Sequence, residues 1–232
     1  MDISEYYDCI DGEIHFNDLK ASQFAKNVSN DQNPIHDHDN KNYCIPGDLI
    51  FSMCADVLGL GSETDLYLHH PIGKNSSILI KEAKDGFYLG RDQSGIKIFT
   101  YRKNGETTDI CDTGNFLNCF ARVTETLFED AIHPQLKQKG LMINPSSPSV
   151  VLTSISIRKS ENSKPVHKIK PDESVATGNV KRAKVTAKYT MNDLYDNSIG
   201  EARKTLFISG LREYCVASMS RYKKMLDLQR YG

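Results

Sequence analysis

The chain has no tryptophan, and only 9% of its 232 residues are aromatic. It has no excess of either charge, because 29 Lys and Arg residues oppose 30 Asp and Glu residues. A near-neutral chain without aromatic-rich segments argues against nucleic acid as a partner. No apolar run approaches the roughly 20 residues that span a bilayer, and no basic segment followed by an apolar one opens the chain. We therefore expect neither export nor membrane insertion.

Paired cysteines are missing as well. The six cysteines are scattered, with no CxxC pair and no spacing typical of a zinc site. This distribution favours reduced thiols in a cytoplasmic protein. The run 36–39 (HDHD) alternates two kinds of metal ligand, and alternate residues of an extended loop can face one ion. A fourth ligand is not evident, so we expect no metal and no bound cofactor.

The sequence does contain enough apolar material for a substantial core, since 39% of the residues are hydrophobic and 25% are charged. Residues 17–28 predict an amphipathic helix that Asn17 can cap. Residues 47–58 predict a second helix, which is apolar on nearly every side and therefore buried. Pro46 and Gly47 mark its start, and Gly59 marks its end.

Strand patterns follow this buried helix and then return later in the chain. The first group covers segments 66–70, 76–82, 86–91 and 95–101, separated by turn residues. The second half shows a helix from Phe116 to Leu127 limited by His133-Pro134, strands over 149–158, 173–179, 180–190 and 198–209, and a final helix over 211–230. The sequence therefore predicts an α+β chain of two halves, 1–105 and 106–232, hinged near 103–114. A single such unit with a divergent tail domain is the alternative.

The most informative segment is 24–36, FAKNVSNDQNPIH. It resembles the hydratase motif of the MaoC-like family, in which a helix ending in Phe-Ala leads into Ser-Gly-Asp-x-Asn-Pro-(Ile/Leu/Val)-His and then into a buried helix entered through a glycine. The matching residues are Ser29, Asp31, Asn33, Pro34, Ile35 and His36, with Gly47 opening the next helix. Most of the chain also resembles a proteobacterial family of MaoC-like proteins of unassigned function, which shares the segments FAKxxxxDxNPIHD and CxPGDLxFS and a late SGL.

The resemblance implies a hot-dog fold, in which antiparallel strands wrap a central helix. Combined with the two halves of the chain, it predicts a double hot-dog of two antiparallel sheets, each wrapping a helix. Hot-dog domains cover their sheet edges by pairing, which two halves of one chain can do internally or two copies can do in a homodimer. Of these, the homodimer is the expectation.

The spacing of Asp31 and His36 has a chemical meaning of its own. Adding water across a double bond conjugated to a thioester needs one group that takes a proton from water and one that delivers a proton to carbon. On a turn stiffened by Pro34, a carboxylate and an imidazole can converge on one water, and Asn33 can hold the turn through backbone hydrogen bonds. From the spacing alone, a polar loop with a solvated histidine is the simpler interpretation, and the family motif favours the catalytic one.

The resemblance implies further that the start of the buried helix binds the thioester oxygen. Free N–H groups and a favourable dipole lie there, and Gly47 is the implied donor. A pantetheine-linked acyl chain would lie along the helix, with Leu49, Ile50 and Met53 as neighbours and Asn33 near the reacting end. Coenzyme A or an acyl-carrier protein then carries the substrate and is not a cofactor.

Two functions stay open at this point. The first is an (R)-specific enoyl-CoA hydratase or dehydratase that acts through Asp31, His36 and the Gly47 amide. The second is a non-catalytic protein that binds acyl-CoA or an acyl carrier. The sequence departs from the family pattern at Asn30, where the family has glycine, at Pro46, where a histidine often stands, and at Asn42, where a small residue is usual. These departures remove no catalytic group but could change the pocket.

Overall fold

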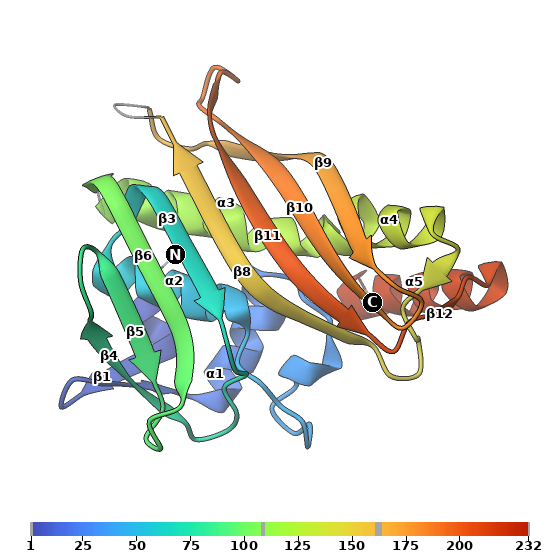
Figure 1. Cartoon of the computed structure of the whole chain (residues 1–232), viewed down its shortest axis with the longest axis horizontal. Helices are drawn as coiled ribbons and strands as arrows, with labels where there is room; N and C mark the ends of the chain where they lie inside the picture. The colour runs from blue at the N-terminus through green and yellow to red at the C-terminus, as the bar shows by residue number, and fades with distance from the viewer. Residues whose placement is uncertain (1, 108–109, 161–163, 232) are drawn as a thin grey trace.

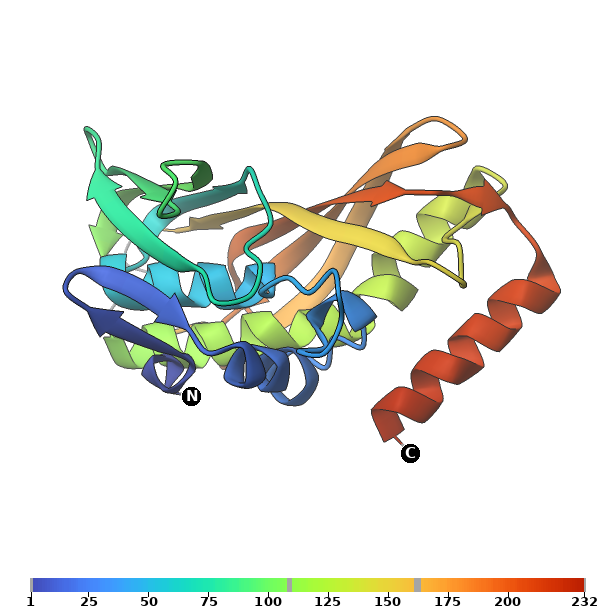
Figure 2. The same ribbon diagram turned by 90° about the horizontal axis from the view of Figure 1, so that it is seen from below.

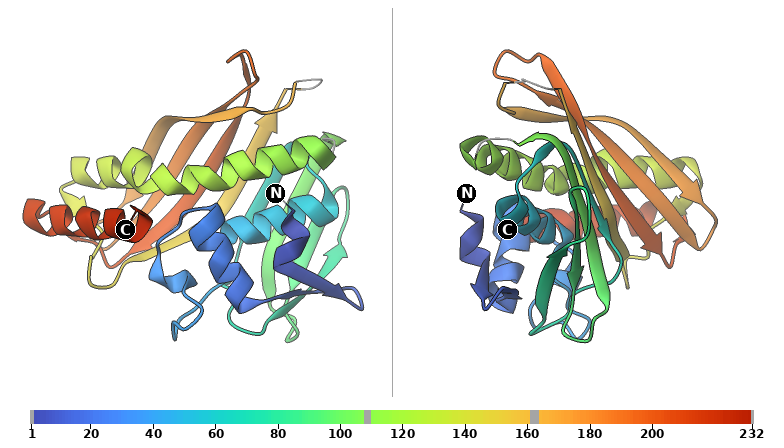
Figure 3. Two further views of the ribbon diagram at one scale, coloured as in Figure 1. Left: turned by 180° about the vertical axis from the view of Figure 1, so that it is seen from behind. Right: turned by 60° about the vertical axis from the view of Figure 1, so that its left-hand side comes forward.

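The structure, a computed structural model, describes residues 2–107, 110–160 and 164–231. Its main feature is a ten-stranded antiparallel sheet with the helices on one face. Figure 1 looks onto the sheet, and the left view of Figure 3 looks onto the helices from behind. The molecule is therefore an α+β protein with a helical layer against one long sheet.

The strands of the large sheet follow the chain in two groups. The first group is β1 (Tyr7–Ile10), β2 (Glu13–Phe16), β3 (Gly61–Leu68), β4 (Ser77–Glu82), β5 (Phe87–Arg91) and β6 (Lys97–Thr107). The second group is β8 (Ser149–Lys159), β9 (Lys168–Gly178), β10 (Arg182–Asn192) and β11 (Ser198–Ser209). Two short strands, β7 (Leu141–Met142) and β12 (Arg212–Glu213), form a separate ladder.

The helical segments include four short irregular turns. The α-helices are α1 (Asp18–Gln23), α2 (Gly47–Leu58), α3 (Ile110–Leu127), α4 (His133–Gln138) and α5 (Val216–Tyr231). The irregular turns are η1 (Ile3–Tyr6), η2 (Phe24–Val28), η3 (Pro34–His36) and η4 (Phe128–Ile132). Within the described ranges, none of the helices combines the length and the apolar character that crossing a membrane requires.

Pairing between β3 and β8 joins the two halves of the chain. The strand order is β1-β2-β4-β5-β6-β3-β8-β11-β10-β9, so the first-half strands lie on one side of this pair and the second-half strands on the other. Its register places Glu63 opposite Arg158 and Tyr67 opposite Ser154. The expectation of two separate sheets is therefore wrong. In each half alone, the strand at this edge would leave backbone N–H and C=O groups unpaired. Pairing between β3 and β8 supplies both strands with hydrogen-bond partners.

Helix α2 is the central helix of the structure. Its residues from Asp48 to Ala55 are all buried, which accounts for an apolar character on nearly every side. Gly59 ends the helix with a φ of 82°, a left-handed conformation that favours glycine. Phe51 packs against Phe116 and Phe120 of α3, with ring centroids 6.5 and 5.4 Å apart. Helices α2 and α3 thus lie side by side beneath the sheet.

Most elements expected in the first half are present, but the sequence pattern did not predict the opening hairpin or the helical turns η1 and η3. The helix expected over 17–28 is α1 continued by the π-helical turn η2, and the Asn17 side chain accepts a hydrogen bond from the Lys20 N–H at 3.1 Å. Strands β1 and β2 were not expected. Asp11 and Gly12 between them have φ values of 52° and 82°, the geometry that makes Asp-Gly a frequent hairpin turn.

In the second half, His133-Pro134 does not end the helical segment. Helix α3 passes through η4 directly into α4, with Pro134 in the first turn of α4. The expected helix end is wrong because proline is tolerated in a first turn, where it removes no intrahelical hydrogen bond. Strand β6 and helix α3 occupy most of the expected hinge at 103–114, and 108–109 lie outside the described residues. The four expected strands are β8 to β11, and the final helix begins later than expected, after β12.

We expect the ion pair beside the β3–β8 ladder to stabilise the fold. Arg158 donates to both carboxylate oxygens of Asp65, at 2.8 and 2.9 Å, and the Asp65 side chain is 3% exposed. Among the described residues, Arg158→Ala would leave that buried carboxylate with the Ser156 hydroxyl, which donates at 2.6 Å. The free energy of unfolding should fall by at least about 2 kcal/mol in urea titrations.

The matched control is Arg203→Ala. Arg203 pairs with Glu201 at the surface, so its loss should change the stability by about 0.5 kcal/mol or less. Equal losses in the two variants would contradict a special role for the ion pair at the junction of the halves.

Candidate active site

The turn that carries the hydratase-like motif is held by its own hydrogen bonds. Asn30 has a φ of 48°, and asparagine tolerates this left-handed conformation better than most residues other than glycine. The Asp31 carboxylate accepts from the Asn33 N–H at 2.9 Å, and the Asn33 side-chain oxygen accepts from the Ile35 N–H at 3.3 Å. Asn30 therefore allows the left-handed turn that precedes Asp31.

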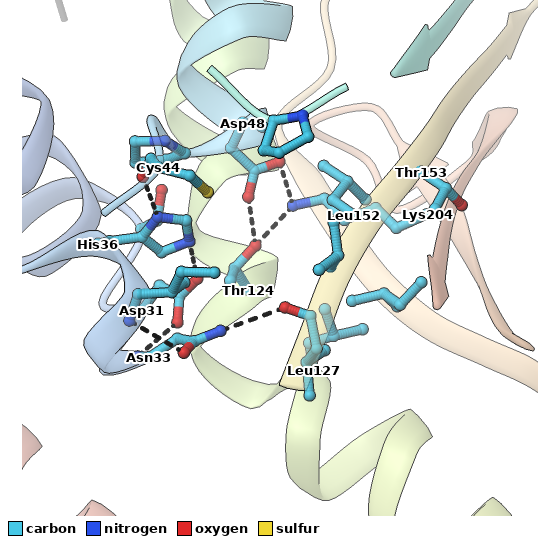
Figure 4. A pocket seen from close by; sticks show the side chains of 18 of the residues that line it. Asp31, Asn33, His36, Cys44, Asp48, Thr124, Leu127, Leu152, Thr153 and Lys204 are labelled. Atoms are coloured by element: carbon cyan, nitrogen blue, oxygen red, sulfur yellow. Dashed lines mark hydrogen bonds and ion pairs between the residues drawn. The ribbon is translucent and has the colours of Figure 1, made fainter. Parts of the chain in front are cut away.

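Asp31 and His36 face each other across this turn (Figure 4). His36 Nε2 lies 3.5 Å from Asp31 Oδ2, and His36 Nδ1 lies 2.8 Å from the carbonyl oxygen of Cys44. A carbonyl oxygen only accepts hydrogen bonds, so Nδ1 must carry a proton. Nε2 is then the nitrogen that gains and loses a proton, and it is the one that faces Asp31.

Each member of this pair stabilises the charge of the other. Burial raises the pKa of Asp31, but the hydrogen bond and positive charge of His36 outweigh burial and hold the pKa below its usual value. Burial lowers the pKa of His36, but interactions with the side chains of Asp31 and Cys44 outweigh burial and raise the pKa to about 10. At neutral pH the pair is a carboxylate beside an imidazolium.

The start of α2 supplies backbone donors beside the pair. In the described part of the chain, neither the Gly47 nor the Asp48 N–H donates to a backbone carbonyl, as expected for the first turn of a helix. A methyl group added at Gly47 would lie 2.8 Å from Leu152 Cδ2 and 2.9 Å from Leu68 Cδ1. Glycine therefore leaves space for these two leucine side chains at the helix start.

These groups line one cavity of about 220 Å³, and both halves of the chain enclose it. The first half contributes Asp31, Asn33, His36 and Gly47. The second half contributes, among others, Thr124, Phe128, Val150, Leu152, Lys204 and Tyr222. The Asn33 side-chain amide also donates to the Val150 carbonyl at 3.2 Å, which ties the motif turn to β8. The cavity therefore lies between the two halves.

Of the three apolar neighbours expected along the central helix, only Ile50 lines the cavity. Leu49 and Met53 are buried in the core, outside the cavity lining. Ile50 lies nearly one turn after Gly47 and shares its side of the helix, whereas the 100° step between residues turns Leu49 and Met53 to other sides. Burial on α2 thus does not by itself place a residue at the cavity.

A buried charged cluster, made of Asp48, Thr124 and Lys204, lines the same cavity (Figure 4). Lys204 is 0% exposed, and its Nζ lies 2.8 Å from Asp48 Oδ1 and 2.6 Å from Thr124 Oγ1. The Thr124 hydroxyl donates to Asp48 Oδ2 at 2.7 Å. Burial holds the pKa of Lys204 below its usual value, although the charge of Asp48 opposes the shift. The cluster connects α2, α3 and β11.

The sequence pattern did not single out this cluster, but β11 carries a signal for it. Ala202, Lys204, Leu206 and Ile208 are all buried and alternate along the strand, so the two-residue period places a lysine among apolar side chains. A charge at such a position requires a partner, because an unpaired buried ammonium is costly. Which carboxylate would supply it could not be read from the strand.

Metal ligands do not gather at this site. In the part of the chain that the structure describes, no group of three or more His, Cys, Asp or Glu side chains is placed to hold an ion. His69 and His70 follow β3 and lie at the exposed rim of the cavity with Pro71. His69 Nε2 is 2.9 Å from Thr100 Oγ1.

The fold and the site define an α+β protein with a cavity that holds an Asp–His pair beside the start of a central helix. The chain belongs to the family described as "Protein of unknown function (DUF3581)", which matches residues 1–217. No curated protein matches the chain in sequence.

Several solved structures are similar to the chain at low sequence identity. An acyl-CoA thioesterase II from Mycobacterium marinum is 9% identical, with 92% of this chain and 99% of that chain covered and a TM-score of 0.45. A conserved protein of unknown function with a hot dog fold from Alicyclobacillus acidocaldarius is 6% identical, with 89% and 97% covered and a TM-score of 0.46. A MaoC-like dehydratase is 9% identical, with 90% and 99% covered and a TM-score of 0.44.

Asp48→Ala should destabilise the protein strongly, because it leaves the Lys204 ammonium buried without its carboxylate. The expected loss in the free energy of unfolding is about 3–5 kcal/mol. The double variant Asp48→Leu/Lys204→Met should lose less, since an apolar pair replaces the ion pair without leaving a charge behind. Urea titrations of Asp48→Leu, Lys204→Met and the double variant measure the coupling. Additive losses would show that the two residues do not act as a pair.

The Asp31–His36 pair should make stability depend on pH in a defined direction. The folded-state pKa of His36 is raised to about 10, so its contribution is complete below the unfolded value near 6.5 and is lost as the pH rises through 10. The folded-state pKa of Asp31 is lowered, so its contribution is present above its unfolded value and is lost as the pH falls further.

This dependence can be measured by unfolding the wild type and Asp31→Asn at several pH values between about 5 and 10. The advantage of the wild type should shrink steadily above about pH 6.5. A difference that stays constant over this range would mean that the two side chains do not share a proton-linked interaction.

Proposed function

We propose that the protein hydrates an enoyl thioester, or dehydrates the corresponding 3-hydroxyacyl thioester, as MaoC-like (R)-specific enoyl-CoA hydratases do. The observation that carries the proposal is the Asp31–His36 pair in one cavity with the N-terminal backbone donors of α2. The substrate carrier is coenzyme A or an acyl-carrier protein.

The charge states at neutral pH assign a role to each member of the pair. As the water oxygen bonds to the β-carbon of the substrate, the Asp31 carboxylate takes one proton from that water. The Nε2–H of the His36 imidazolium delivers a proton to the α-carbon. The proton on Asp31 then passes to Nε2 across the 3.5 Å that separate the two groups, which restores both. The elements of water are added across the double bond, and no net charge is gained or lost.

The thioester oxygen gains negative charge while the α-carbon awaits its proton. The N–H groups of Gly47 and Asp48 and the positive end of the α2 dipole favour that charge in a site shielded from water. Leu152 and Leu68 pack where a side chain at position 47 would lie, so these two leucines form an apolar wall beside the N–H donors. The motif residues thus provide a base, an acid and an oxyanion site within one cavity.

The departures from the family pattern leave the cavity in place. Asn30 adopts a left-handed conformation, with a φ of 48°, which glycine also adopts readily. Pro46 precedes the helix, and its carbonyl accepts from the Leu49 and Ile50 N–H groups at 3.1 and 3.2 Å, so it begins α2 normally. Asn42 is exposed and lies outside the cavity lining. These observations favour turnover over binding alone.

We also propose that 1–105 and 106–232 are two hot-dog units merged through β3 and β8 into a double hot-dog. This view accounts for two long helices against one sheet. The homodimer and the cytoplasmic location expected from the sequence stay predictions.

Asp31→Asn should abolish hydration while leaving the fold intact, because an amide cannot take a proton from water. We expect a fall in kcat/KM of about 10²–10⁴, and a similar fall for His36→Ala. The assay follows the loss of enoyl-thioester absorbance with crotonyl-CoA and longer enoyl-CoAs. Asp37→Asn is the matched control, since Asp37 pairs with Lys26 at 2.8 Å and lies outside the cavity lining.

Circular dichroism confirms that each variant is folded before its rate is compared. A wild-type rate in Asp31→Asn would remove the pair from the chemistry. If the wild type binds acyl-CoA saturably but never turns over enoyl-CoA, the protein is the non-catalytic binding protein and not the hydratase.

A further inference from the structure

The last helix, α5, stands apart from the layered body of the molecule (Figure 2). One stripe of its side chains is buried, formed by Met219, Tyr222 and Leu226 at 2%, 8% and 7% exposure. Their spacing of three and four residues places them on one side of the helix. Leu228, two residues after Leu226, points elsewhere and is 64% exposed. The helix thus presents a single apolar stripe to the rest of the chain.

This stripe meets the chain at the turn η4. The Tyr222 ring contacts the Phe128 ring edge to face, with centroids 5.5 Å apart. Next to it, Lys223 Nζ lies 2.6 Å from Glu129 Oε2. These contacts hold α5 against η4, and the β7–β12 ladder anchors the chain just before the helix begins.

Tyr222 and Leu226 of this stripe also line the cavity of the Asp31–His36 pair. The lining is uneven in its exposure: His69, His70 and Pro71 are exposed, whereas Phe128, Tyr222 and Leu226 are buried. Val151 of β8, which is 37% exposed, lines the cavity as well. A ligand would enter past the exposed residues, and the buried side chains of η4 and α5 would cover the other end. The family match ends at residue 217, so most of the helix that closes this end lies beyond it.

We propose that α5 sets the length of the acyl chain that the protein accepts. The thioester lies at Gly47 and the Asp31–His36 pair, the chain extends past the apolar side chains of η4, and its end meets Tyr222 and Leu226. Tyr222 and Leu226 are thus specificity-determining residues for a fatty acyl thioester. This inference rests on the proposed function for the nature of the ligand, but it concerns binding and not turnover.

The physical consequence is an affinity ladder, in which Kd falls with each added methylene up to a defined chain length and then stays constant. Each methylene that moves from water into the apolar part of the cavity should tighten Kd about fourfold. Once the chain reaches α5, a further methylene either stays outside or crowds a packed wall, so Kd stops improving. The chain length at which the ladder levels off measures the distance to the closed end.

The first experiment measures Kd for saturated acyl-CoAs of increasing length, which have no double bond to hydrate. Leu226→Ala should move the levelling point to longer chains, and Leu226→Phe should move it to shorter ones. Leu228→Ala is the matched control, the same substitution on the same helix at an exposed position, and should keep the wild-type ladder. The two opposite changes at Leu226 separate a change in cavity length from a loosened helix.

The absence of tryptophan makes a second, independent measurement straightforward. In Tyr222→Trp, the only indole of the protein stands where the acyl chain should end, and in Leu228→Trp it stands on the exposed side of α5. The emission of the Tyr222→Trp variant should respond to chains at or beyond the levelling length and not to short ones. The emission of Leu228→Trp should not depend on chain length.

The outcomes distinguish this inference from the proposed function. If the wild type binds neither acyl-CoAs nor the corresponding acyl-carrier thioesters, the proposed function fails. If acyl-CoAs bind but both Leu226 variants keep the wild-type ladder, and the Tyr222→Trp emission ignores chain length, the role of α5 is overturned and the proposed function stands. Loss of crotonyl-CoA hydration in Asp31→Asn remains a separate test.

Discussion

The backbone ladder between β3 and β8 holds both halves of the chain in one sheet, and the cavity depends on it. By joining the two strand groups edge to edge, it brings α2 and α3 to the same face, where they pack through Phe51, Phe116 and Phe120. The motif turn of the first half then meets β8 of the second, through the hydrogen bond from Asn33 to the Val150 carbonyl. A shift of one half against the other would therefore open the site.

Two ion pairs share this largely apolar cavity, and their charges interact. Asp31 with His36 and Asp48 with Lys204 are each close to neutral as a pair at neutral pH. Charges shielded from water interact over longer distances than charges at the surface. Asp31 is among the charges that oppose the lowering of the Lys204 pKa. Asp48 also lies in the first turn of α2, where the helix dipole favours a negative charge. A change of charge in one pair thus changes the electrostatic free energy of the other pair.

Local signals in the sequence were enough to predict the elements that position the motif. Asn17 caps the first helix, Gly47 and Gly59 bound the central one, and the strand patterns of both halves fall on strands of the sheet. These features depend on residues within a few positions of each other, so a pattern can reveal them. The Asp-Gly turn between β1 and β2 carried the same kind of signal, although the pattern around it was too short to predict strands.

Contacts between distant segments could not be predicted in the same way. The alternation in β11 places Lys204 inside, but only the assembled sheet shows that Asp48 and Thr124 receive it. Nor does the burial of α2 tell which of its apolar residues face the cavity, since Leu49 is as deeply buried as Ile50. The motif predicted Asp31 and His36 as members of the candidate site, and the fold showed which other residues line the cavity.

Every residue of the hydratase-like motif belongs to the first half, whereas much of the wall around it comes from the second. The motif segment therefore cannot form the cavity without the second half of the chain. Residues 1–105 alone would expose an unpaired β3 edge and the apolar surface of α2, both of which promote aggregation. Sequence changes in the second half can reshape the surroundings of Asp31 and His36 without altering the motif. Two proteins of this family with the same motif can thus diverge in what they bind, and a comparison restricted to the motif would not reveal it.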